Sequence, residues 1–506
     1  MIAKIDYLLD RVTMYRLVLY VLIALIGVAT VLAYFKFLPF SPLALLASTV
    51  VLVILCWATN TIFGYFFEVP TNIESATITA LILTLIIDPA QTHASFQFLG
   101  WAAILAMASK YILALYKKHI FNPAAIAVVI TSFVLGESAS WWIGTTSMLP
   151  LVLIGGLLIA RKLRQIDLVI VFSVTALLCD CVINLVQGKS ALTEINQLLL
   201  LSPLFFFATV MLTEPLTAPP TRRLRQLYAV ITGILFIPQL HIGSIYLTPE
   251  LALVLGNVFS YLVSPKQRVV LRLSRKIKMG PGMLDFVFKP SQKLAFVPGQ
   301  YMEFTLEHPH ADSRGNRRYF TLASSPTENN VHVGVRFYEQ GSSFKNAMQR
   351  MDGKTKIVAA QIAGDFTLPS DPKQKLVFIA GGIGITPFRS MLKYLLDTRQ
   401  RRDIILLYAN RYANEIAYKD ILNSAHTQLG IKTFCTLTDA TAVPRDWTGF
   451  VGRLNEQMIL QTIPDYSERT YYISGPPDMV RAYEEVLKNM NIKNDQIKKD
   501  FFPRLV

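Results

Sequence analysis

The chain divides by its hydrophobic pattern into two halves of about equal length. Up to about residue 264, long apolar segments alternate with short polar loops, whereas from about residue 267 the pattern is that of a water-soluble protein. Most of the apolar segments are long enough to cross a hydrocarbon core of ~30 Å. We therefore expect an α-helical polytopic membrane domain over residues 1–265 with ten segments, at about 14–35, 42–65, 75–88, 95–116, 122–136, 140–159, 166–187, 195–213, 226–241 and 248–264.

Basic residues fall in alternate loops between these segments, which predicts an orientation. The odd-numbered loops hold only Lys36 and Lys189. The N-terminus and the even-numbered loops, except the second, hold Lys4, Arg11, Arg16, Lys117, Lys118, Arg161, Lys162, Arg164, Arg222, Arg223 and Arg225. By the positive-inside rule, this pattern predicts a multi-pass protein of the inner (cytoplasmic) membrane with both termini in the cytoplasm.

The composition agrees with this division and excludes several classes of function. Of the 506 residues, 52% are hydrophobic and 16% are charged, which is typical of a chain that is partly in lipid. The basic residues of the membrane half lie mostly in its loops, where they set the orientation of the segments. The net charge of +15 therefore does not by itself indicate a nucleic-acid partner. The four cysteines are too few and too scattered for an iron–sulfur cluster or a disulfide framework, and we expect no metal.

Two acid–proline pairs indicate an internal repeat in the membrane half. The third segment ends in Asp88-Pro89 and the eighth ends in Glu214-Pro215, five segments later. An odd spacing inverts the second copy relative to the first, and inverted-repeat membrane proteins place their binding site at interrupted helices near the repeat interface. The alternative is that two unrelated helix ends are stopped by proline.

The membrane half also contains runs that are typical of a known family. They are residues 74–77, Lys110-Tyr111, the run His-Ile-Phe-Asn-Pro-Ala-Ala at 119–125, and the run from Phe205 to Thr217. On these runs, residues 1–265 resemble the D subunit of Rnf complexes and the B subunit of the sodium-pumping NADH:quinone reductase. The resemblance implies a flavin-carrying, electron-transferring membrane subunit with a five-plus-five inverted topology.

Four polar residues are the candidate contacts of a membrane flavin or quinone: Lys110, Asn122 and Glu214 in these runs, and Asn257 in the tenth segment, where the family also has an asparagine. For Lys110 the alternative is that its side chain reaches the cytoplasmic surface from the end of its span. The D subunits carry FMN on a threonine of a long loop between the fifth and sixth segments, but here that loop is reduced to about residues 136–140. We therefore expect any FMN or riboflavin in this half to be bound non-covalently.

The second half of the chain shows two successive patterns of strands and helices. Residues 267–368 contain short strands with alternating apolar positions, which predicts an antiparallel β-barrel. From Lys375, apolar strands alternate with helices, as in a doubly wound sheet. We expect a barrel over 267–368 and an α/β nucleotide-binding domain over 374–506.

The first chemical motif lies on one of the expected barrel strands, Arg318-Tyr319-Phe320-Thr321. A flavin nucleotide needs a cation for its pyrophosphate, a flat surface for its ring and a donor near the reactive ring nitrogen. Arginine, an aromatic residue and a hydroxyl supply these three. Strand alternation puts Arg318 and Phe320 on one face, with Thr321 at its edge.

Further candidate positions follow strands or open helices. The hydroxyls of Ser342 and Ser343 lie where a helix is expected to start, which suits a phosphate. Two glycine-bearing runs each follow an apolar strand, and glycines allow phosphates to approach a helix N-terminus closely. Their candidate cofactor residues are Gly381, Gly382, Gly384, Thr386 and Pro387 in one run and Ser474, Gly475, Pro476, Asp478 and Met479 in the other.

In this order, the three motifs resemble the ferredoxin–NADP reductase superfamily over roughly residues 267–500. The resemblance implies that the barrel binds FAD and the α/β domain binds NAD(P)H, with Thr321 and Ser474 beside the hydride path. The superfamily usually has cysteine where this chain has Ser474, so we expect an altered rate rather than lost activity. Many members cover the flavin with a C-terminal aromatic residue, and here either Phe501 or Phe502 does so or both pack in the core.

Two questions stay open at the sequence level. Arg411 either contacts a 2′-phosphate or pairs with Glu415, so the choice between NADH and NADPH is not decided. The two halves together predict an FAD-dependent NAD(P)H oxidoreductase that passes electrons to a membrane flavin, a quinone or an extracytoplasmic redox protein. The alternative is a transporter or scaffold with an appended reductase that serves a separate partner.

Overall fold

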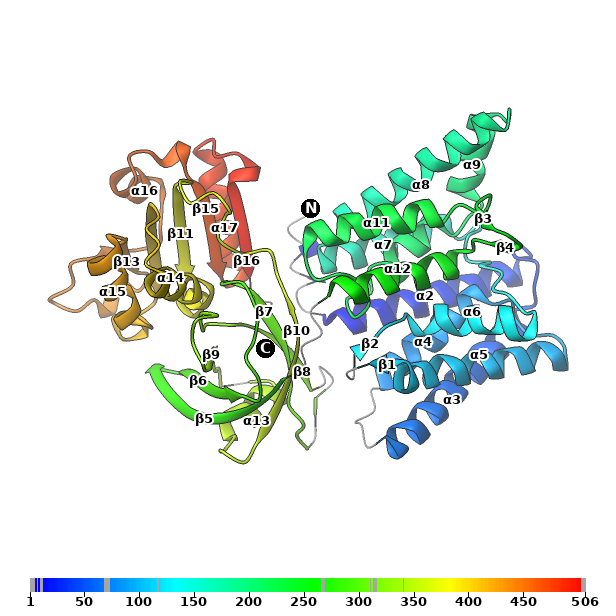
Figure 1. Cartoon of the computed structure of the whole chain (residues 1–506), viewed down its shortest axis with the longest axis horizontal. Helices are drawn as coiled ribbons and strands as arrows, with labels where there is room; N and C mark the ends of the chain where they lie inside the picture. The colour runs from blue at the N-terminus through cyan, green and yellow to red at the C-terminus, as the bar shows by residue number, and fades with distance from the viewer. Residues whose placement is uncertain are drawn as a thin grey trace. The chain divides into compact units, whose positions relative to one another are not determined.

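The computed structural model describes residues 5–6, 8–9, 12–67, 73–115, 118–264, 269–309, 311–312, 316–339 and 341–501. They form two compact units, residues 1–266 and residues 267–506 (Figure 1). The predictions for Lys4, Arg11, Lys117 and Phe502, and for the side chains of Lys118 and Phe501, lie outside the described residues.

Every one of the ten expected apolar segments of the N-terminal unit contains a helix. Three of them, α2, α3 and α8, are long and apolar enough to cross a membrane, or four spans result if the bent pair α9 and α10–η1 is one span. The helices are α2 Met14–Tyr34, α3 Pro42–Phe66, α4 Ile73–Ile86, α5 His93–Ile112, α6 Pro123–Leu135, α7 Leu149–Leu163, α8 Ile166–Val186, α9 Ala191–Leu200, α10 Leu204–Phe206, the π-helix η1 Phe207–Met211, α11 Arg222–Leu235 and α12 Pro249–Val263.

Two of the expected segments depart most from the structure. Helix α7, in the sixth segment, begins at Leu149 rather than at 140, because the backbone N–H groups of Ser140 and Trp141 donate to the carbonyl of Ile86, each at 2.9 Å. The eighth segment is not continuous, since it bends by 58° between Leu200 and Leu204. Pro203 at the break cannot donate a helical hydrogen bond.

The helices of the two halves of this unit pack in the same order. In the first half, α4 packs against α2 and α3, and α5 packs against α3 and α6. In the second half, η1 packs against α7 and α8, and α11 packs against α8 and α12. The pairs α2–α7 and α6–α12 join the halves. Helices α6 and α12, which occupy equivalent places, both begin with a capping residue followed by proline.

The outward faces of the long helices are apolar. Ile23 of α2, Ile54 of α3 and Val182 of α8 are each more than half exposed, at 52%, 55% and 58%. Inward residues of the same helices, such as Leu25 and Leu52, are fully buried. A helix that is apolar on both its buried and its exposed faces is suited to lipid.

The C-terminal unit begins with a barrel of six antiparallel strands in the order β8-β7-β10-β5-β6-β9 (Figure 1). Burial alternates along β5, as a strand with one face on a core requires. The strands are β5 Val269–Gly280, β6 Met283–Pro290, β7 Tyr301–Thr305, β8 Arg317–Thr321, β9 Val331–Arg336 and β10 Lys356–Ala363, with α13 Ser343–Arg350 between β9 and β10. The expected antiparallel barrel is confirmed.

A parallel sheet follows in the order β14-β13-β12-β11-β15-β16. Every residue of β11 and β12 is buried, because helices cover both faces of a parallel sheet. The strands are β11 Leu376–Gly381, β12 Ile404–Asn410, β13 Lys432–Leu437, β14 Phe450–Val451, β15 Thr470–Gly475 and β16 Ile497–Phe501; the main helices are α14 Thr386–Thr398, α15 Lys419–Leu429, α16 Glu456–Thr462 and α17 Pro477–Asn489. The expected α/β domain is therefore present.

Candidate functional site

Arg318 and Phe320 lie on the same face of β8, next to the start of α13. The Arg318 guanidinium lies over the Phe344 ring, 5.3 Å from its centroid. The Phe320 ring packs between Phe304 and Phe344, with centroids 5.5 and 5.9 Å away. Phe320 thus contacts the barrel core on one side and is half-buried overall.

The other two residues of this motif lie on the opposite face of β8. Tyr319 is 45% exposed, and its hydroxyl donates to Glu303 Oε2 at 2.8 Å. Thr321 is buried at the end of the strand, opposite Tyr301 of β7. The strand therefore offers a cation and an aromatic ring on one face and a hydroxyl at its end.

The N-terminus of α13 already holds an anionic group. The Ser342 hydroxyl caps the helix by accepting from the backbone N–H of Lys345 at 3.3 Å. The backbone N–H of Ser343 donates to Asp312 Oδ2 at 3.0 Å, and Arg318 Nη2 lies 3.7 Å from Asp312 Oδ1. The Asp312 carboxylate thus occupies the place of an anion between a helix N-terminus and an arginine.

These residues fit FAD. Arg318 and the start of α13 would hold its pyrophosphate, where the Asp312 carboxylate now lies. Phe320 and Thr321 would lie beside its ring. Bound there, FAD supplies the chemistry that accepts a hydride.

The two glycine-bearing motifs of the α/β domain lie side by side. Strands β11 and β15 are parallel neighbours in which Ala380 is opposite Ser474, so their carboxyl ends coincide. A Cβ atom on Gly384 would overlap the carbonyl oxygen of Ser474 and lie 2.6 Å from the Cα of Gly475. A Cβ atom on Gly381 would overlap the sulfur of Met479. The backbone contact requires glycine at 384, whereas at 381 the overlapping atoms are the flexible end of the Met479 side chain.

Ser474 carries a hydroxyl without a visible role in the fold. The residue is 0% exposed, and its Oγ has no hydrogen-bond partner in the part of the chain that the structure describes. A buried polar group left unpaired costs about 1–3 kcal/mol. Such groups are rare in folded proteins and are expected where a ligand completes the hydrogen bonding.

The remaining residues of the two motifs divide into buried and exposed positions. Gly382 has a φ of 53°, in the left-handed region that favours glycine. Thr386 and Pro387 start α14, and Thr386 is 2% exposed. Pro476 caps α17 beside Gly381. Asp478, in contrast, has a side chain that is 65% exposed and pairs with Arg481.

A buried charged network between barrel and α/β domain has no counterpart in the sequence predictions. Arg389 of α14 donates to Glu328 of the barrel, at 2.9 Å from Nη2 to Oε1, and its guanidinium lies 5.6 Å from the Tyr418 ring centroid. His332 Nδ1 lies 2.7 Å from Asp285 Oδ2. Burial, with the Asp285 charge nearby, raises the pKa of Tyr418 well above its usual range. These partners are far apart in sequence and belong to no local motif.

Arg411 follows the carboxyl end of β12, and its side chain pairs with Asp439. Its Nε is 3.3 Å from Asp439 Oδ2, whereas Glu415 binds Arg336 at 2.6 Å. Only the backbone N–H of Arg411 reaches Glu415. Of the two alternatives for Arg411, the side-chain pair with Glu415 is therefore not formed among the described residues, and contact with a 2′-phosphate stays a prediction.

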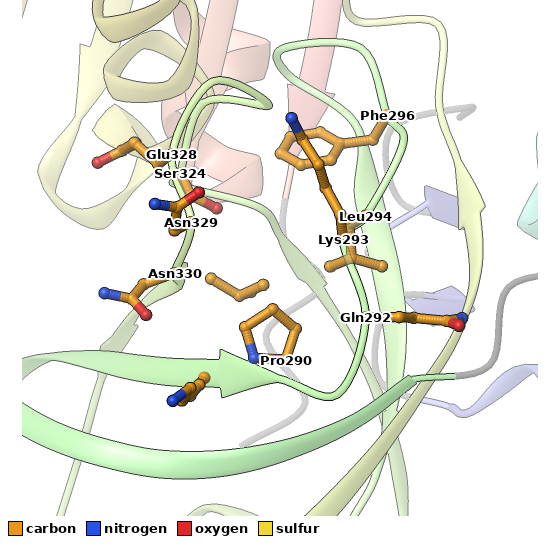
Figure 2. Close-up of a pocket in the computed structure, with 11 residues that line it drawn as sticks. Pro290, Gln292, Lys293, Leu294, Phe296, Ser324, Glu328, Asn329 and Asn330 are labelled. Carbon is orange, nitrogen blue, oxygen red and sulfur yellow. The ribbon is translucent and has the colours of Figure 1, made fainter.

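A cavity of about 240 Å³ opens in the barrel between residues 289–296 and 324–331. Figure 2 shows Lys293 and Phe296 on one side of it and Ser324, Glu328 and Asn329 on the other. None of the candidate cofactor residues lines this cavity. It is thus separate from the flavin and nucleotide motifs.

In the N-terminal unit, three of the four candidate residues form one hydrogen-bonded cluster. The Asn122 side chain caps α6, and its Nδ2 donates to Glu214 Oε2 at 2.8 Å. The backbone N–H of Asn122 donates to Asn257 Oδ1 at 2.8 Å, and Asn257 Nδ2 donates to the Tyr228 hydroxyl at 3.1 Å. The cluster joins α6 of the first half to α11, α12 and the segment after η1 of the second half.

Lys110, the fourth candidate, is engaged with α4. Its Nζ donates to the carbonyl and hydroxyl of Ser75, both at 3.2 Å, and to the Thr79 hydroxyl at 3.1 Å. In the described residues, no hydrogen bond links it to Asn122 or Glu214. The ammonium is held between helices instead of extending freely from the end of α5.

Comparison with known proteins agrees with the site in the C-terminal unit. Residues 378–485 match the oxidoreductase NAD-binding domain family. The chain is 27% identical over 210 residues to the glycine betaine monooxygenase reductase subunit of Chromohalobacter salexigens, which covers 40% of this chain and 56% of the relative. It is 26% identical over 226 residues to the stachydrine N-demethylase reductase subunit of Rhizobium meliloti (44% and 63%) and 26% over 249 residues to the flavohemoprotein of Bacillus thuringiensis (45% and 59%).

Among solved structures, the flavohem-like FAD/NAD-binding domain of nitric oxide dioxygenase from Vibrio cholerae is 18% identical, with a TM-score of 0.42, over 46% of this chain and 98% of that chain. The chain spans about three fifths of the length of the curated relatives it matches. The C-terminal unit thus contains an oxidoreductase NAD-binding domain, and relatives named as reductase subunits agree with the expected FAD-dependent NAD(P)H oxidoreductase. The family match does not extend to residues 1–265, so their resemblance to Rnf and sodium-pumping reductase subunits stays a prediction.

Proposed function

We propose that this chain is a membrane-bound flavoprotein that oxidises cytoplasmic NAD(P)H and passes the electrons to an acceptor at its N-terminal unit. The observation that carries the proposal is the meeting of the two glycine motifs at the carboxyl ends of β11 and β15, with the unpartnered Ser474 hydroxyl between them. In parallel sheets, nucleotides bind at this edge.

We assign the binding of FAD and the binding of NAD(P)H to different parts of the C-terminal unit. Arg318 and the start of α13 would bind the FAD phosphates, and the turn at Gly382 and Gly384 would bind those of NAD(P)H at the N-terminus of α14. Hydride transfer takes place between the nicotinamide ring of NAD(P)H and the flavin ring of FAD. The hydroxyl groups of Thr321 and Ser474 would lie beside these two rings. Precise placement of both nucleotides accounts for much of the rate in such a transfer.

The acceptor site that we propose is the cluster of Asn122, Glu214 and Asn257, with Lys110 as a further cation. Three features support it: the cluster is largely buried, it lies where the two halves of the unit meet, and it begins at the N-terminus of a short helix. Amide and carboxyl groups complement the carbonyl and N–H groups of a quinone or of a non-covalent FMN or riboflavin. An extracytoplasmic redox protein would then take electrons from this site.

A second candidate function is that of a reductase for a separate partner, with the N-terminal unit as its anchor, scaffold or transporter. The names of two relatives favour it, since they are reductase subunits of a monooxygenase and of a demethylase. In that case an oxygenase component takes the electrons, and the membrane cluster has no redox role.

A pair of variants separates the two candidates. The full chain is purified into nanodiscs, and oxidation of NADH and of NADPH is followed with ferricyanide and with a short-chain ubiquinone. Arg318→Ala should abolish both reactions, because it removes the FAD phosphate contact. Asn122→Ala should abolish only quinone reduction. If Asn122→Ala reduces quinone at the rate of the unmodified protein, the membrane acceptor site is wrong and the second candidate is favoured.

The flavin content of the purified chain is an independent measure. Acid precipitation should release FAD together with FMN or riboflavin, since the loop at 136–140 offers no covalent attachment. Release of FAD alone would exclude a flavin in the N-terminal unit and leave a quinone as the membrane acceptor to be tested.

A further inference from the structure

The cavity of the barrel is not accounted for by the flavin or the nucleotide. It has a volume of about 240 Å³ and opens between the end of β6 with the loop after it and the segment that joins β8 to β9. Leu294, Phe296 and Val331 give it apolar walls. Sites for larger ligands measure roughly 300–1,000 Å³, so the occupant of this cavity must be a small molecule.

The Ser324 hydroxyl lies in the wall of the cavity without a partner. The residue is 1% exposed, and its Oγ has no hydrogen-bond partner in the part of the chain that the structure describes. Figure 2 shows Ser324 beside Glu328 and Asn329, across the cavity from Lys293 and Phe296. Buried polar side chains are nearly always hydrogen-bonded in folded proteins. This hydroxyl therefore indicates that a ligand completes the cavity.

The charges around the cavity select an anion. Among the described residues that line it, Glu328 is the one acid, and the Arg389 guanidinium already binds it through both carboxylate oxygens. Lys289 and Lys293 line the cavity as well, and neither forms an ion pair within the described ranges. One carboxylate neutralised by one guanidinium leaves two ammonium groups without a counter-charge. A negatively charged ligand supplies it.

Lys289 also belongs to a row of cations that crosses three strands. It is paired with Arg272 of β5, and Arg272 is paired in turn with Lys356 of β10. All three residues are exposed. Residues paired across antiparallel strands have their side chains on the same face, and like charges placed opposite each other destabilise a sheet. An anion bound at Lys289 offsets this repulsion.

We propose that the cavity binds a small organic carboxylate. The ammonium groups of Lys289 and Lys293 bind its carboxylate, the Ser324 hydroxyl donates to it, and its apolar part packs against Leu294 and Phe296. Phosphate sites are typically built from arginine or from backbone N–H groups at a helix start. The described lining of the cavity contains neither, which favours a carboxylate over a phosphate ester.

The same wall is hydrogen-bonded to the helix that begins at the nucleotide turn. The carbonyl of Ser324 accepts from the Ser390 hydroxyl at 2.6 Å, and the carbonyl of Ala323 accepts from Arg389 Nη1 at 3.0 Å. Both donors belong to α14, which begins at Thr386. A carboxylate in the cavity therefore acts on α14 and regulates nucleotide binding. This regulation rests on the proposed function, whereas the binding of the carboxylate does not.

Fluorine NMR of para-fluorobenzoate with the full chain in nanodiscs provides the test. The signal should broaden on binding and sharpen again when benzoate is added, but not when benzamide, its neutral analogue, is added. Lys293→Met and Ser324→Ala should each weaken binding about tenfold, because each removes a hydrogen bond to a charged group. Lys278→Met is the matched control, since this exposed lysine of β5 does not line the cavity, and it should bind as the unmodified chain does.

Three results would overturn the carboxylate site: no broadening at the highest soluble concentration of the probe, equal competition by benzamide and benzoate, or equal weakening in Lys278→Met and Lys293→Met. Regulation is measured as the Kd of the probe with and without saturating NAD⁺, which should differ several-fold because coupling between two sites is reciprocal. Equal Kd values would overturn the regulation alone. A chain that binds the probe in a Lys293-dependent manner but does not oxidise NAD(P)H would refute the proposed function and leave the carboxylate site standing.

Discussion

Ser474 has a polar side chain in a fully buried place of the C-terminal unit. Its hydroxyl is fully buried and unpartnered among the described residues, so it contributes a cost to folding instead of a benefit. We expect Ser474→Ala to slow flavin reduction by NAD(P)H about tenfold, whereas the free energy of unfolding should stay equal or rise by ~1 kcal/mol. Stopped-flow absorbance and denaturant unfolding measure the two effects.

The matched variant for this position is Ser474→Cys. A thiol is of similar size and restores the residue that the resembling superfamily usually has there, so flavin reduction should proceed at least as fast as in the unmodified chain. Equal rates in the alanine and cysteine variants would show that the side chain at 474 takes no part in hydride transfer.

The surroundings of Cys435 lower the reactivity of its thiol. It lies on β13 beside Tyr408, and burial raises the pKa of its thiol to about 11. At pH 8 the reactive thiolate is then roughly a hundred times scarcer than for an ordinary thiol. Iodoacetamide should therefore modify Cys435 very slowly in the folded chain and readily after denaturation, as mass spectrometry of the peptide would show. Equal rates in the folded and denatured chain would contradict the raised pKa.

At the level of single residues, sequence reasoning found the groups that belong to local motifs and missed those that depend on tertiary contacts. Arg318, Gly384 and Ser474 could be named because short spacings to a strand or helix start define them. Arg389 and Glu328 could not, because their pairing joins residues 61 positions apart across two domains. A buried arginine pair of this kind leaves no periodic signal in the sequence.

The turn between β11 and α14 is the element on which nucleotide binding depends. A methyl group on Gly384 would meet backbone atoms of Ser474 and Gly475 at the end of β15, so Gly384→Ala must separate the turn from this strand end. We expect the KM for NAD(P)H to rise on the order of tenfold or more, while FAD content stays unchanged because β8 and α13 are not touched. Steady-state kinetics and flavin absorbance give both quantities.

Gly353 provides the matched control for this substitution. A Cβ atom there would have only the Leu273 carbonyl oxygen nearby, at 3.8 Å, which is ordinary van der Waals contact. Gly353→Ala should leave KM unchanged. A similar KM for Gly384→Ala and Gly353→Ala would show that the close approach of the two loops is not needed for binding.

At the level of elements, hydrophobic periodicity located the helices better than it located their ends. Trp141 and Trp142 belong to an apolar run and were expected to be helical, yet Trp142 donates from its indole to the carbonyl of Thr84 at 2.9 Å, and the backbone of Trp141 binds the end of α4. The last turn of a helix leaves carbonyls without partners, and here a neighbouring segment satisfies them. Such a use of the backbone depends on the fold and cannot be inferred from apolar spacing.

For the whole molecule, the number of membrane crossings determines where the C-terminal unit lies. Helices α4 and α6, with 14 and 13 residues, are about 20 Å long and shorter than a hydrocarbon core of ~30 Å. If only α2, α3 and α8 crossed, Arg223 and the C-terminal unit would lie outside, away from cytoplasmic NAD(P)H. Four crossings or ten crossings both return them to the cytoplasm.

Glu137 distinguishes the last two topologies. It follows α6, so ten crossings place it outside, whereas four crossings, by α2, α3, α8 and the bent pair, leave it in the cytoplasm. In spheroplasts that express a cysteine-free background, Glu137→Cys, Lys36→Cys and Lys189→Cys should react with an impermeant maleimide, since all three positions are exposed. Arg223→Cys should react only after lysis. Protection of Glu137→Cys with labelling of Lys36→Cys would rule out ten crossings, and with it a flavin subunit of five plus five inverted helices.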